Sequence, residues 1–210
     1  MGGARPVRGA PARGYTGRVA AEAEAEAGRA AAERATLACA TAVAHLRAGG
    51  VPVESLAEYV ASRRVLLWTR PATMRPLGEV WRIGSLLLGT DGDLYALGKA
   101  TRAAERGRPG YQSASREERR EIAAAALRGG YPAGAPVNFD AQRIPLSSEG
   151  DGAPRTGSDA AASRELPVGY ADGEFRVRWR AGAPLAGAPT LAAFLRERVD
   201  LLLHPPFRDG

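Results

Sequence analysis

The stretch that most constrains the fold is residues 80–102, V-W-R-I-G-S-L-L-L-G-T-D-G-D-L-Y-A-L-G-K-A-T-R. Two apolar runs separated by Asp91-Gly92 predict a β-hairpin, because Asp-Gly readily adopts the positive φ values of a two-residue turn. The pairs set by such a turn are Leu88 with Tyr95, Leu86 with Leu97 and Gly84 with Lys99. Both faces are apolar near the turn, so we expect a central hairpin with helices against at least one face.

The length and hydropathy of the chain indicate one soluble domain. Its 210 residues suffice for a substantial core. No stretch approaches the ~20 consecutive apolar residues that span a bilayer, so we expect no membrane partner and a cytoplasmic location. Residues 1–18 carry four arginines, no acidic residue and no apolar segment typical of a secretory signal. We therefore expect a disordered basic tail over 1–18 and a single domain over 19–206.

The net charge of +6 is unevenly distributed along the chain. The tail supplies +4, which leaves +2 for the remainder and argues against nucleic-acid binding by the folded part. Of the 29 basic residues only Lys99 is lysine. This bias is typical of a GC-rich genome, so the number of arginines is a poor guide to function.

The rest of the chain predicts an α+β fold with a mostly antiparallel sheet built from two β-hairpins. Composition and spacing predict helices over 19–47, 54–62 and 115–128, and a last helix capped by Thr190. Ser115 and Glu118 form a candidate capping box for the third of these. Strands are predicted over 65–68 and 137–139, and a second hairpin over 168–180 turns at Asp172-Gly173. Residues 147–165 are small and polar, which predicts a flexible insert.

The cysteine and the histidines do not form a recognisable catalytic set. Cys39, Val43 and Leu46 follow one apolar line of the first helix, which predicts a core cysteine. His45 points about 240° away from Cys39 at ~100° per residue. His204 could approach the thiol only through tertiary packing, and a thiolate nucleophile needs a base within hydrogen-bond reach. A single cysteine also excludes an internal disulfide and a cysteine-rich zinc site.

Lys99 is the strongest candidate for a reactive side chain, because its predicted partner Gly84 would leave room for a ligand. A partly buried lysine could act as a base or form a Schiff base, whereas an exposed one would only reach into water. In the second hairpin, Phe175 and Trp179 should face away from three arginines, which predicts a solvated basic row. These arginines are Arg176, Arg178 and Arg180. No phosphate loop, dinucleotide fingerprint or paired histidines occur, so we expect neither a cofactor nor a metal.

Two family resemblances follow from these residues. The hairpin I-G-S-L-L-L-G-T-D-G-D-L-Y-A-L-G, followed by a helix that opens S-R-E-E-R, resembles the hairpin and active-site helix of cytidine deaminases. Those enzymes carry a Cys or His zinc ligand two residues before the catalytic Glu, but here Ser115 precedes Glu117 and no Cys-x-x-Cys follows. The resemblance therefore implies a shape without zinc chemistry.

From Trp81 to Pro206 the chain resembles a family of uncharacterised proteins from GC-rich bacteria, some of which are labelled glutaminase. W-R-I-G-S-L-L-L, the R-G-G-Y segment and L-A-A-F-L-R-E-R-V-D-L-L-L-H-P-P carry this likeness. A serine-type glutaminase would need Ser-x-x-Lys, whereas Ala96 stands three residues before Lys99. An amidotransferase would need a cysteine on a strand-to-helix elbow, and Cys39 lies within a predicted helix.

We therefore expect a small non-catalytic binding or interaction domain with its partner site near Lys99, Arg82 and Tyr111. Two alternatives remain open: a glutaminase-type amide hydrolase, implied by the family label, and nucleic-acid binding through the Arg-rich tail. The chain is also a candidate homo-oligomer.

Overall fold

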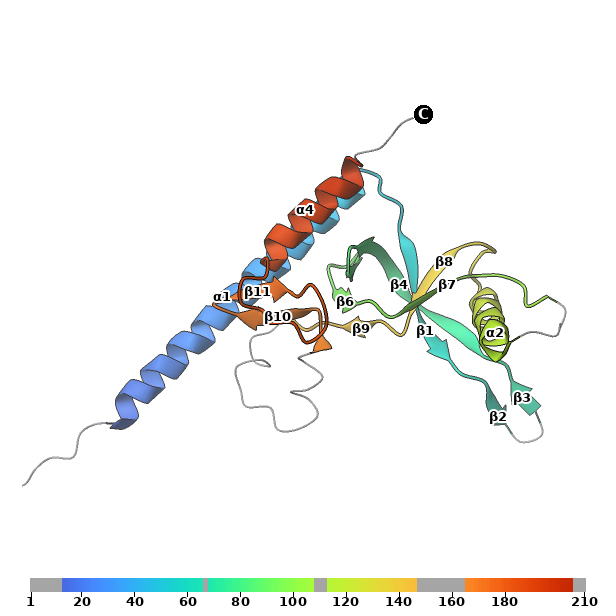
Figure 1. The fold of residues 1–210 in the computed structure, drawn as a ribbon, viewed down its shortest axis with the longest axis horizontal. Coiled ribbons are helices and arrows are strands. Elements are labelled where there is room, and N and C mark those ends of the chain that lie inside the picture. Colours follow the sequence, from blue (N-terminus) through green and yellow to red (C-terminus); the bar gives the residue numbers. More distant parts are fainter. Residues whose placement is uncertain (1–12, 66–67, 108–112, 147–164, 206–210) are drawn as a thin grey trace, which may run out of the picture.

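The computed structural model describes residues 13–65, 68–107, 113–146 and 165–205, which fold around a seven-stranded mixed sheet (Figure 1). The strands in spatial order are β7 (Lys99–Arg102), β8 (Pro136–Phe139), β1 (Glu54–Val60), β4 (Thr73–Ile83), β5 (Leu86–Gly89), β6 (Leu94–Ala96) and β9 (Gln142–Arg143). The α+β class is confirmed. The description as a mostly antiparallel sheet built from two hairpins is imprecise, because β1 and β8 run parallel and the second hairpin forms a separate sheet.

The predicted hairpin over 80–102 is divided into four strands. A two-residue turn at Gly84-Ser85 already joins β4 to β5, and Gly84 supplies the positive φ of 57° that this turn requires. The next loop contains three residues rather than two. Leu88 consequently pairs with Leu94, one residue out of the predicted register. A shift of one residue turns every side chain of β6 to the other face.

A β-bulge lets β4 contribute to apolar clusters at both ends of the sheet. Its pairing with β1 shifts by one residue and leaves Leu77 as the extra residue. Met74, before the bulge, and Trp81, after it, therefore point to the same face, against which the helices pack. Val80 and Arg82 point to the opposite face, where Val80 belongs to a third, smaller apolar cluster.

Two parallel helices cover one end of the sheet (Figure 1). They are α1 (Arg13–Ala48) and α4 (Leu191–Leu203), which confirms the first and last predicted helices. Their apolar residues bury Trp81, Leu86 and Leu88 in the largest core cluster. The Thr190 side chain accepts a hydrogen bond from the backbone N–H of Ala193, so the predicted N-cap of α4 is confirmed.

The third helix, α2 (Ala114–Arg128), covers the other end of the sheet and packs over Met74, Val137 and Phe139. The predicted capping box is wrong. Ser113 rather than Ser115 is the N-cap, and the Ser113 carbonyl accepts hydrogen bonds from the first turn while its hydroxyl makes no capping bond. The two serines lie two residues apart and both suit an N-cap, so composition could not separate them.

Residues 54–62 do not form the predicted helix. Glu54–Val60 is β1, an interior strand of the sheet between β8 and β4. The predicted strand over 65–68 is also wrong, because Val65 ends β2 (Arg63–Val65) and Trp68 begins β3 (Trp68–Arg70) of a separate hairpin. The predicted strand over 137–139 is confirmed as part of β8.

The second hairpin pairs β10 (Val168–Ala171) with β11 (Glu174–Val177) and turns at Asp172-Gly173, as predicted. It ends three residues earlier than predicted, and Trp179, which lies beyond its end, is 74% exposed. The predicted solvated arginine row is wrong. Arg176 and Arg178 donate hydrogen bonds to backbone carbonyls, because residues 180–190 fold back over this hairpin.

Two predicted disordered segments fall mainly outside the described residues. The predicted tail includes residues 1–12, which are not described, while α1 begins at Arg13. The predicted insert includes residues 147–164, which are likewise not described. Among the described residues, no helix is both long and apolar enough to cross a bilayer.

Candidate binding surface

Cys39 lies in the largest core cluster and is 1% exposed. Burial, with a smaller contribution from the charge of Asp93, raises the pKa of the thiol to about 11. His45 is exposed on another side of the same helix, and His204 is exposed and contacts Asp200 at 3.0 Å. The structure therefore does not bring either histidine to the thiol, and the predicted core position of Cys39 is confirmed.

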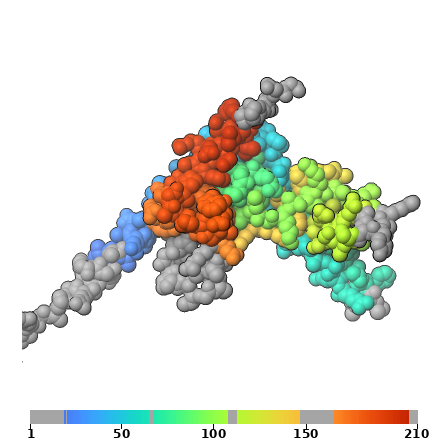
Figure 2. All heavy atoms as spheres, in the orientation of Figure 1, coloured from blue at the N-terminus to red at the C-terminus, as the bar shows by residue number. Residues whose placement is uncertain are grey.

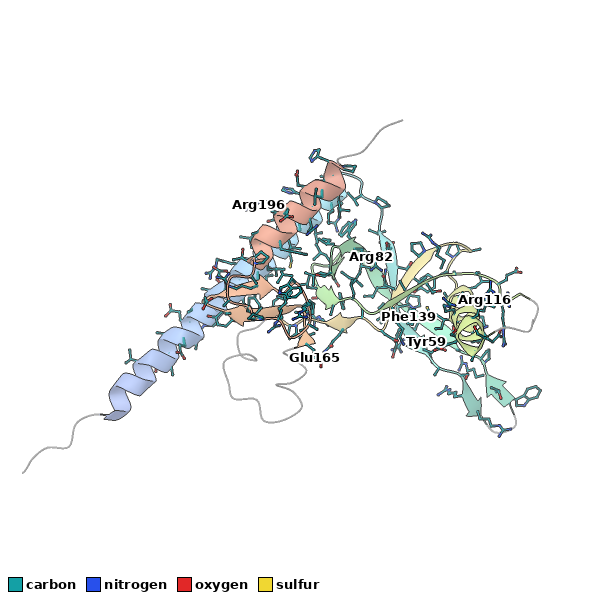
Figure 3. The ribbon with its side chains drawn as sticks, in the orientation of Figure 1. Tyr59, Arg82, Arg116, Phe139, Glu165 and Arg196 are labelled. Atoms are coloured by element: carbon teal, nitrogen blue, oxygen red, sulfur yellow. The ribbon has the colours of Figure 1, made fainter. Side chains whose placement is uncertain are left out.

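Lys99 and Arg82, two of the three predicted binding residues, lie on opposite faces of the sheet. Lys99 pairs with Phe139 rather than with Gly84, and its ammonium group contacts Asp140 at 3.1 Å. Arg82 contacts Asn138, which precedes Phe139 on β8 and so points the other way (Figure 3). Tyr111, the third residue, lies outside the described residues.

Arg82 belongs to a polar cluster that joins three strands. Its Nη2 donates to Oδ1 of Asn138 at 2.5 Å, and Nδ2 of Asn138 donates to Oε2 of Glu54 at 2.8 Å. Asn138 is 1% exposed and also donates to the Ser55 carbonyl at 3.2 Å. Both ends of the buried amide are therefore satisfied, which fixes β4, β8 and β1 relative to one another.

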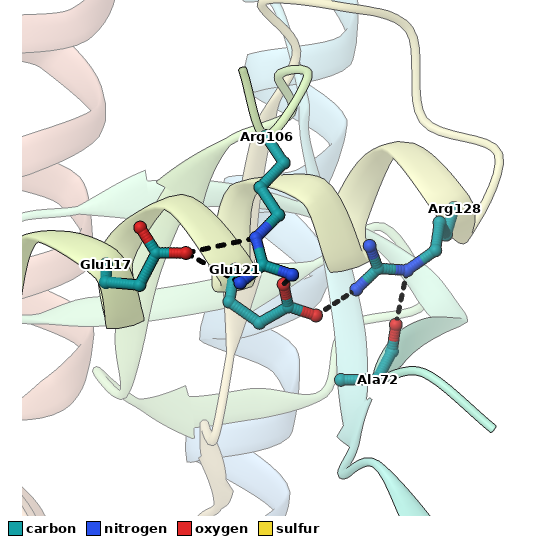
Figure 4. Close-up of polar contacts among 5 residues, drawn as sticks. All are labelled: Ala72, Arg106, Glu117, Glu121 and Arg128. Atoms are coloured by element: carbon teal, nitrogen blue, oxygen red, sulfur yellow. Dashed lines mark hydrogen bonds and ion pairs between the residues drawn. The ribbon is translucent and has the colours of Figure 1, made fainter. Parts of the chain in front are cut away.

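A second polar network fixes α2 to the sheet (Figure 4). Arg106 donates to Oε1 of Glu117 at 2.6 Å and lies 3.4 Å from Glu121. Glu121 accepts a hydrogen bond at 2.5 Å from Arg128, whose Nε donates to the Ala72 carbonyl at 2.7 Å. These contacts hold the C-terminal end of α2 at the start of β4, and we assign this network to stability.

A largely apolar groove lies between α1 and α4, with a volume of about 560 Å³. Its apolar part is formed by Leu37, Ala38, Thr41 and Ala42 of α1 with Leu195 and Val199 of α4. Leu195 and Val199 are buried and form the floor, whereas Leu37 stands on the rim and is 68% exposed. An exposed leucine beside an apolar groove makes this surface a candidate for docking.

Charged side chains also line this groove. Arg196 and Asp200 line it from α4, one helical turn apart, and Arg34 lines it from α1 (Figure 3). Arg34 already contacts Glu174 at 3.0 Å, and Asp200 contacts His204. Arg196 has no ion-pair partner among the described residues, so its charge is available to a molecule in the groove.

The sequence pointed to the buried face of α1 but not to the groove. Cys39, Val43 and Leu46 were identified as one apolar line, and all three are buried. Leu37 lies outside that line, and an apolar residue there is the sequence signal that could have indicated a second apolar surface on this helix. Its partners on α4 could not be known before the two helices were placed together.

Comparisons of the chain with protein-family models, with curated proteins and with solved structures found no match. Within the described ranges, no group of three or more His, Cys, Asp or Glu residues is arranged to hold a metal ion.

Proposed function

We propose that the protein is a non-catalytic interaction domain that associates with a second copy of itself through the α1–α4 groove. The observation that supports this proposal is the apolar groove, whose floor is Leu195 and Val199 and whose rim carries the exposed Leu37. In a symmetric dimer the same patch serves both copies, so each Leu37 can enter the other copy's groove. The alanines of the groove leave space for such a side chain.

The two helices run in the same direction, so the groove has a defined polarity. Arg34 contacts Glu174 near the start of α4, and the space beside Gly49 is filled by Leu203 near its end. A second copy related by a two-fold axis across the groove therefore presents its helices antiparallel to the first. This arrangement places the start of one α4 beside the end of the other.

The charges that line the groove are complementary between two copies related by this two-fold axis. Arg196 and Asp200 lie two residues before and two residues after Arg198. If the two α4 helices cross at the level of Arg198, each Arg196 faces the other copy's Asp200. A pair of opposite charges on each side of an apolar centre favours this antiparallel alignment over a parallel one, which would place like charges together.

The test is a measurement of mass against concentration by analytical ultracentrifugation. We expect a monomer–dimer equilibrium for the wild-type chain, a monomer for Leu37→Asp, and wild-type behaviour for the control Leu77→Asp. Leu77 is 58% exposed on β4, so the control adds the same charge at a comparable exposed leucine. A wild-type chain that remains monomeric at all concentrations would rule out self-association.

A charge swap tests the alignment of the two copies. Arg196→Asp and Asp200→Arg should each weaken the dimer, because each places like charges opposite one another across the interface. The double variant Arg196→Asp/Asp200→Arg should restore it, since the exchanged charges again face opposite partners. Failure of the double variant to recover would contradict the antiparallel arrangement.

The non-catalytic part of the proposal is tested separately against the amide-hydrolase alternative. Purified protein incubated with glutamine should release no ammonia above the rate without protein. Release that Cys39→Ala or Lys99→Ala abolishes would overturn this part of the proposal.

A further inference from the structure

The hairpin of β2 and β3 projects from the sheet as a short arm (Figure 1). It forms its own two-stranded sheet, and the side chains described in it, those of residues 63, 64 and 68–70, are exposed and belong to none of the three apolar clusters. The space-filling view shows it standing clear of the body at the end opposite α1 (Figure 2). The arm therefore contributes little to the core, and its composition needs another explanation.

Trp68 is 80% exposed on this arm, although an indole ring normally lies at least partly in an apolar environment. The other two tryptophans differ from it. Trp81 is 3% exposed in the core, and Trp179 is 74% exposed but has the Arg180 guanidinium 4.3 Å from its ring centre. An open aromatic face on a projecting hairpin is available for stacking by a ligand.

Two of the three arginines of the arm share a face with Trp68. Arg63 pairs directly with Arg70, and Val65 pairs with Trp68. Because side chains alternate along a strand, Arg63, Arg70 and Trp68 share one face of the arm, while Arg64 lies on the other. Like charges directly opposite in a hairpin repel each other. Among the described residues these arginines have no ion-pair partner, so the arm concentrates unneutralised positive charge around an open ring.

We infer that this arm binds single-stranded nucleic acid, with Trp68 stacking on a base and Arg63 and Arg70 contacting the flanking phosphates. Unpaired bases offer their faces to an aromatic side chain, whereas the bases of a duplex are already stacked on one another. The phosphates would also neutralise the Arg63–Arg70 repulsion. The second hairpin lacks this combination, because Arg176 and Arg178 are occupied by backbone carbonyls.

A second basic group lies on α2, the helix fixed to the base of the arm by the hydrogen bond from Arg128 to Ala72. Arg116, Arg119 and Arg120 line a hollow of about 590 Å³ near its N-terminal end. Nη1 of Arg120 is buried and has no hydrogen-bond partner in the described part of the chain. This group offers a second contact for a strand that extends beyond the arm.

The test is titration of a fluorescein-labelled 20-nucleotide oligothymidylate and of a duplex of equal length, followed by anisotropy. We expect tighter binding of the single strand. Trp68→Ala should weaken it by about 5- to 150-fold, the range that loss of one stacked base implies. The matched control Trp179→Ala should leave it unchanged. No saturable binding, equal binding by Trp68→Ala, or preference for the duplex would each overturn the inference.

Salt dependence tests the phosphate contacts. Arg63→Gln/Arg70→Gln should lower the slope of log K against log salt by about 1.4, since each single-strand phosphate contact contributes about 0.7. The control Arg29→Gln/Arg180→Gln removes the same charge elsewhere and should leave the slope unchanged. Far-ultraviolet circular dichroism verifies that each variant is folded.

Three further outcomes would also overturn the inference. Binding lost on deletion of residues 1–12 but kept in the arm variants would assign it to the basic tail. Anionic phospholipid vesicles that bind through Trp68 while the oligonucleotide does not would identify a membrane surface instead. Binding lost in the Leu37→Asp variant even for an 8-nucleotide strand would mean that one arm is not a complete site. The inference does not rest on self-association, so it can hold if the dimer fails.

Discussion

Asn138 is the residue at which three strands of the sheet are joined by side-chain contacts. Its amide lies between the Arg82 guanidinium and the Glu54 carboxylate, which are themselves 3.7 Å apart. A buried amide can bridge a cation and an anion because it carries both an acceptor and a donor. The contacts of Arg82 therefore support a structural role for this residue. We propose no ligand for the exposed part of its side chain.

Replacement of Asn138 by Ala should lower the free energy of unfolding by about 2–4 kcal/mol. The change removes the buried amide that hydrogen-bonds both charged groups and leaves them only their 3.7 Å ion pair. Urea denaturation should show a lower midpoint with an unchanged slope. The control Gln142→Ala, at an exposed position of β9, should shift the midpoint by less than about 0.5 kcal/mol. An equally small effect of Asn138→Ala would contradict the proposed role of this residue.

Cys39 should be unreactive in the folded protein. Its pKa of about 11 lies above the ordinary value of 9.0, so the thiol stays protonated at pH 8, and burial also blocks access to it. Ellman's reagent at pH 8 should therefore label the thiol only after guanidinium unfolds the chain. The variant Ala40→Cys, at an exposed position of the same helix outside the groove, should react at once. Rapid labelling of wild-type Cys39 would indicate an accessible, activated thiol and would favour the catalytic alternative.

At the scale of elements, β1 shows where sequence reasoning is limited. Its segment E-S-L-A-E-Y-V contains good helix formers, and the sequence predicted a helix. Pairing with β4 on one side and β8 on the other makes it an interior strand instead. Leu56 and Ala57, neighbours in the chain, are both buried because both faces are covered at this point. Local propensity contains no information about such distant partners.

Turns were located more reliably than registers. Asp91-Gly92 and Asp172-Gly173 both lie in hairpin loops, but only the second sets the predicted pairing. In the first, the Asp91 carboxylate accepts a hydrogen bond from the Asp93 N–H and lengthens the loop by one residue. Gly84-Ser85, the missed turn, carries a usable signal, because glycine followed by serine between apolar runs is itself typical of two-residue turns.

The candidate site was less predictable than the fold. Lys99 and Arg82 were grouped through a hairpin register that the structure does not have. Trp68 was assigned to the end of a single predicted strand instead of to an exposed arm, because V-L-L-W has the pattern of a continuous apolar run. Binding surfaces depend on which faces remain uncovered after packing, and that information is absent from local patterns.

The contact between α2 and β4 can be tested at a single glycine. A Cβ at Gly129 would lie 2.3 Å from the Met74 carbonyl oxygen, so Gly129→Ala should separate the helix from the strand and destabilise the protein by more than about 2 kcal/mol. At Gly130 the added Cβ meets nothing within 4 Å, and only the strain of its φ of 92° remains. Gly130→Ala should therefore cost about 1 kcal/mol. Thermal unfolding of both variants measures this difference, and equal losses would contradict the close approach.

At the scale of the whole molecule, the two proposed surfaces lie at opposite ends of the described structure (Figure 1). The groove is formed by α1 and α4, and the arm of β2 and β3 extends from the far end of the sheet. Association through the groove would therefore leave both arms free. A dimer would carry two binding sites for one long polyanionic strand.

This arrangement predicts that self-association increases affinity for long strands only. When one arm of a dimer is bound, the second meets the same strand at a high effective concentration, and avidity follows without any new contact. At concentrations where the wild-type chain is dimeric, Leu37→Asp should weaken binding of a 60-nucleotide strand by at least about tenfold. Binding of an 8-nucleotide strand, which one arm occupies, should be unchanged.

The charge-swap variants provide the matching control. The single variants Arg196→Asp and Asp200→Arg should weaken both the dimer and the binding of the long strand, and the double variant Arg196→Asp/Asp200→Arg should restore both. Equal affinity of wild-type and Leu37→Asp proteins for the long strand would show that the two arms cannot reach it together. A double variant that dimerises but does not bind the long strand more tightly would lead to the same conclusion. In either case the dimer would not hold its two arms at a spacing that one strand can span. The dependence of affinity on strand length therefore tests how the groove and the arm are placed relative to each other. Neither the self-association measurement nor the short-strand titration tests this placement on its own.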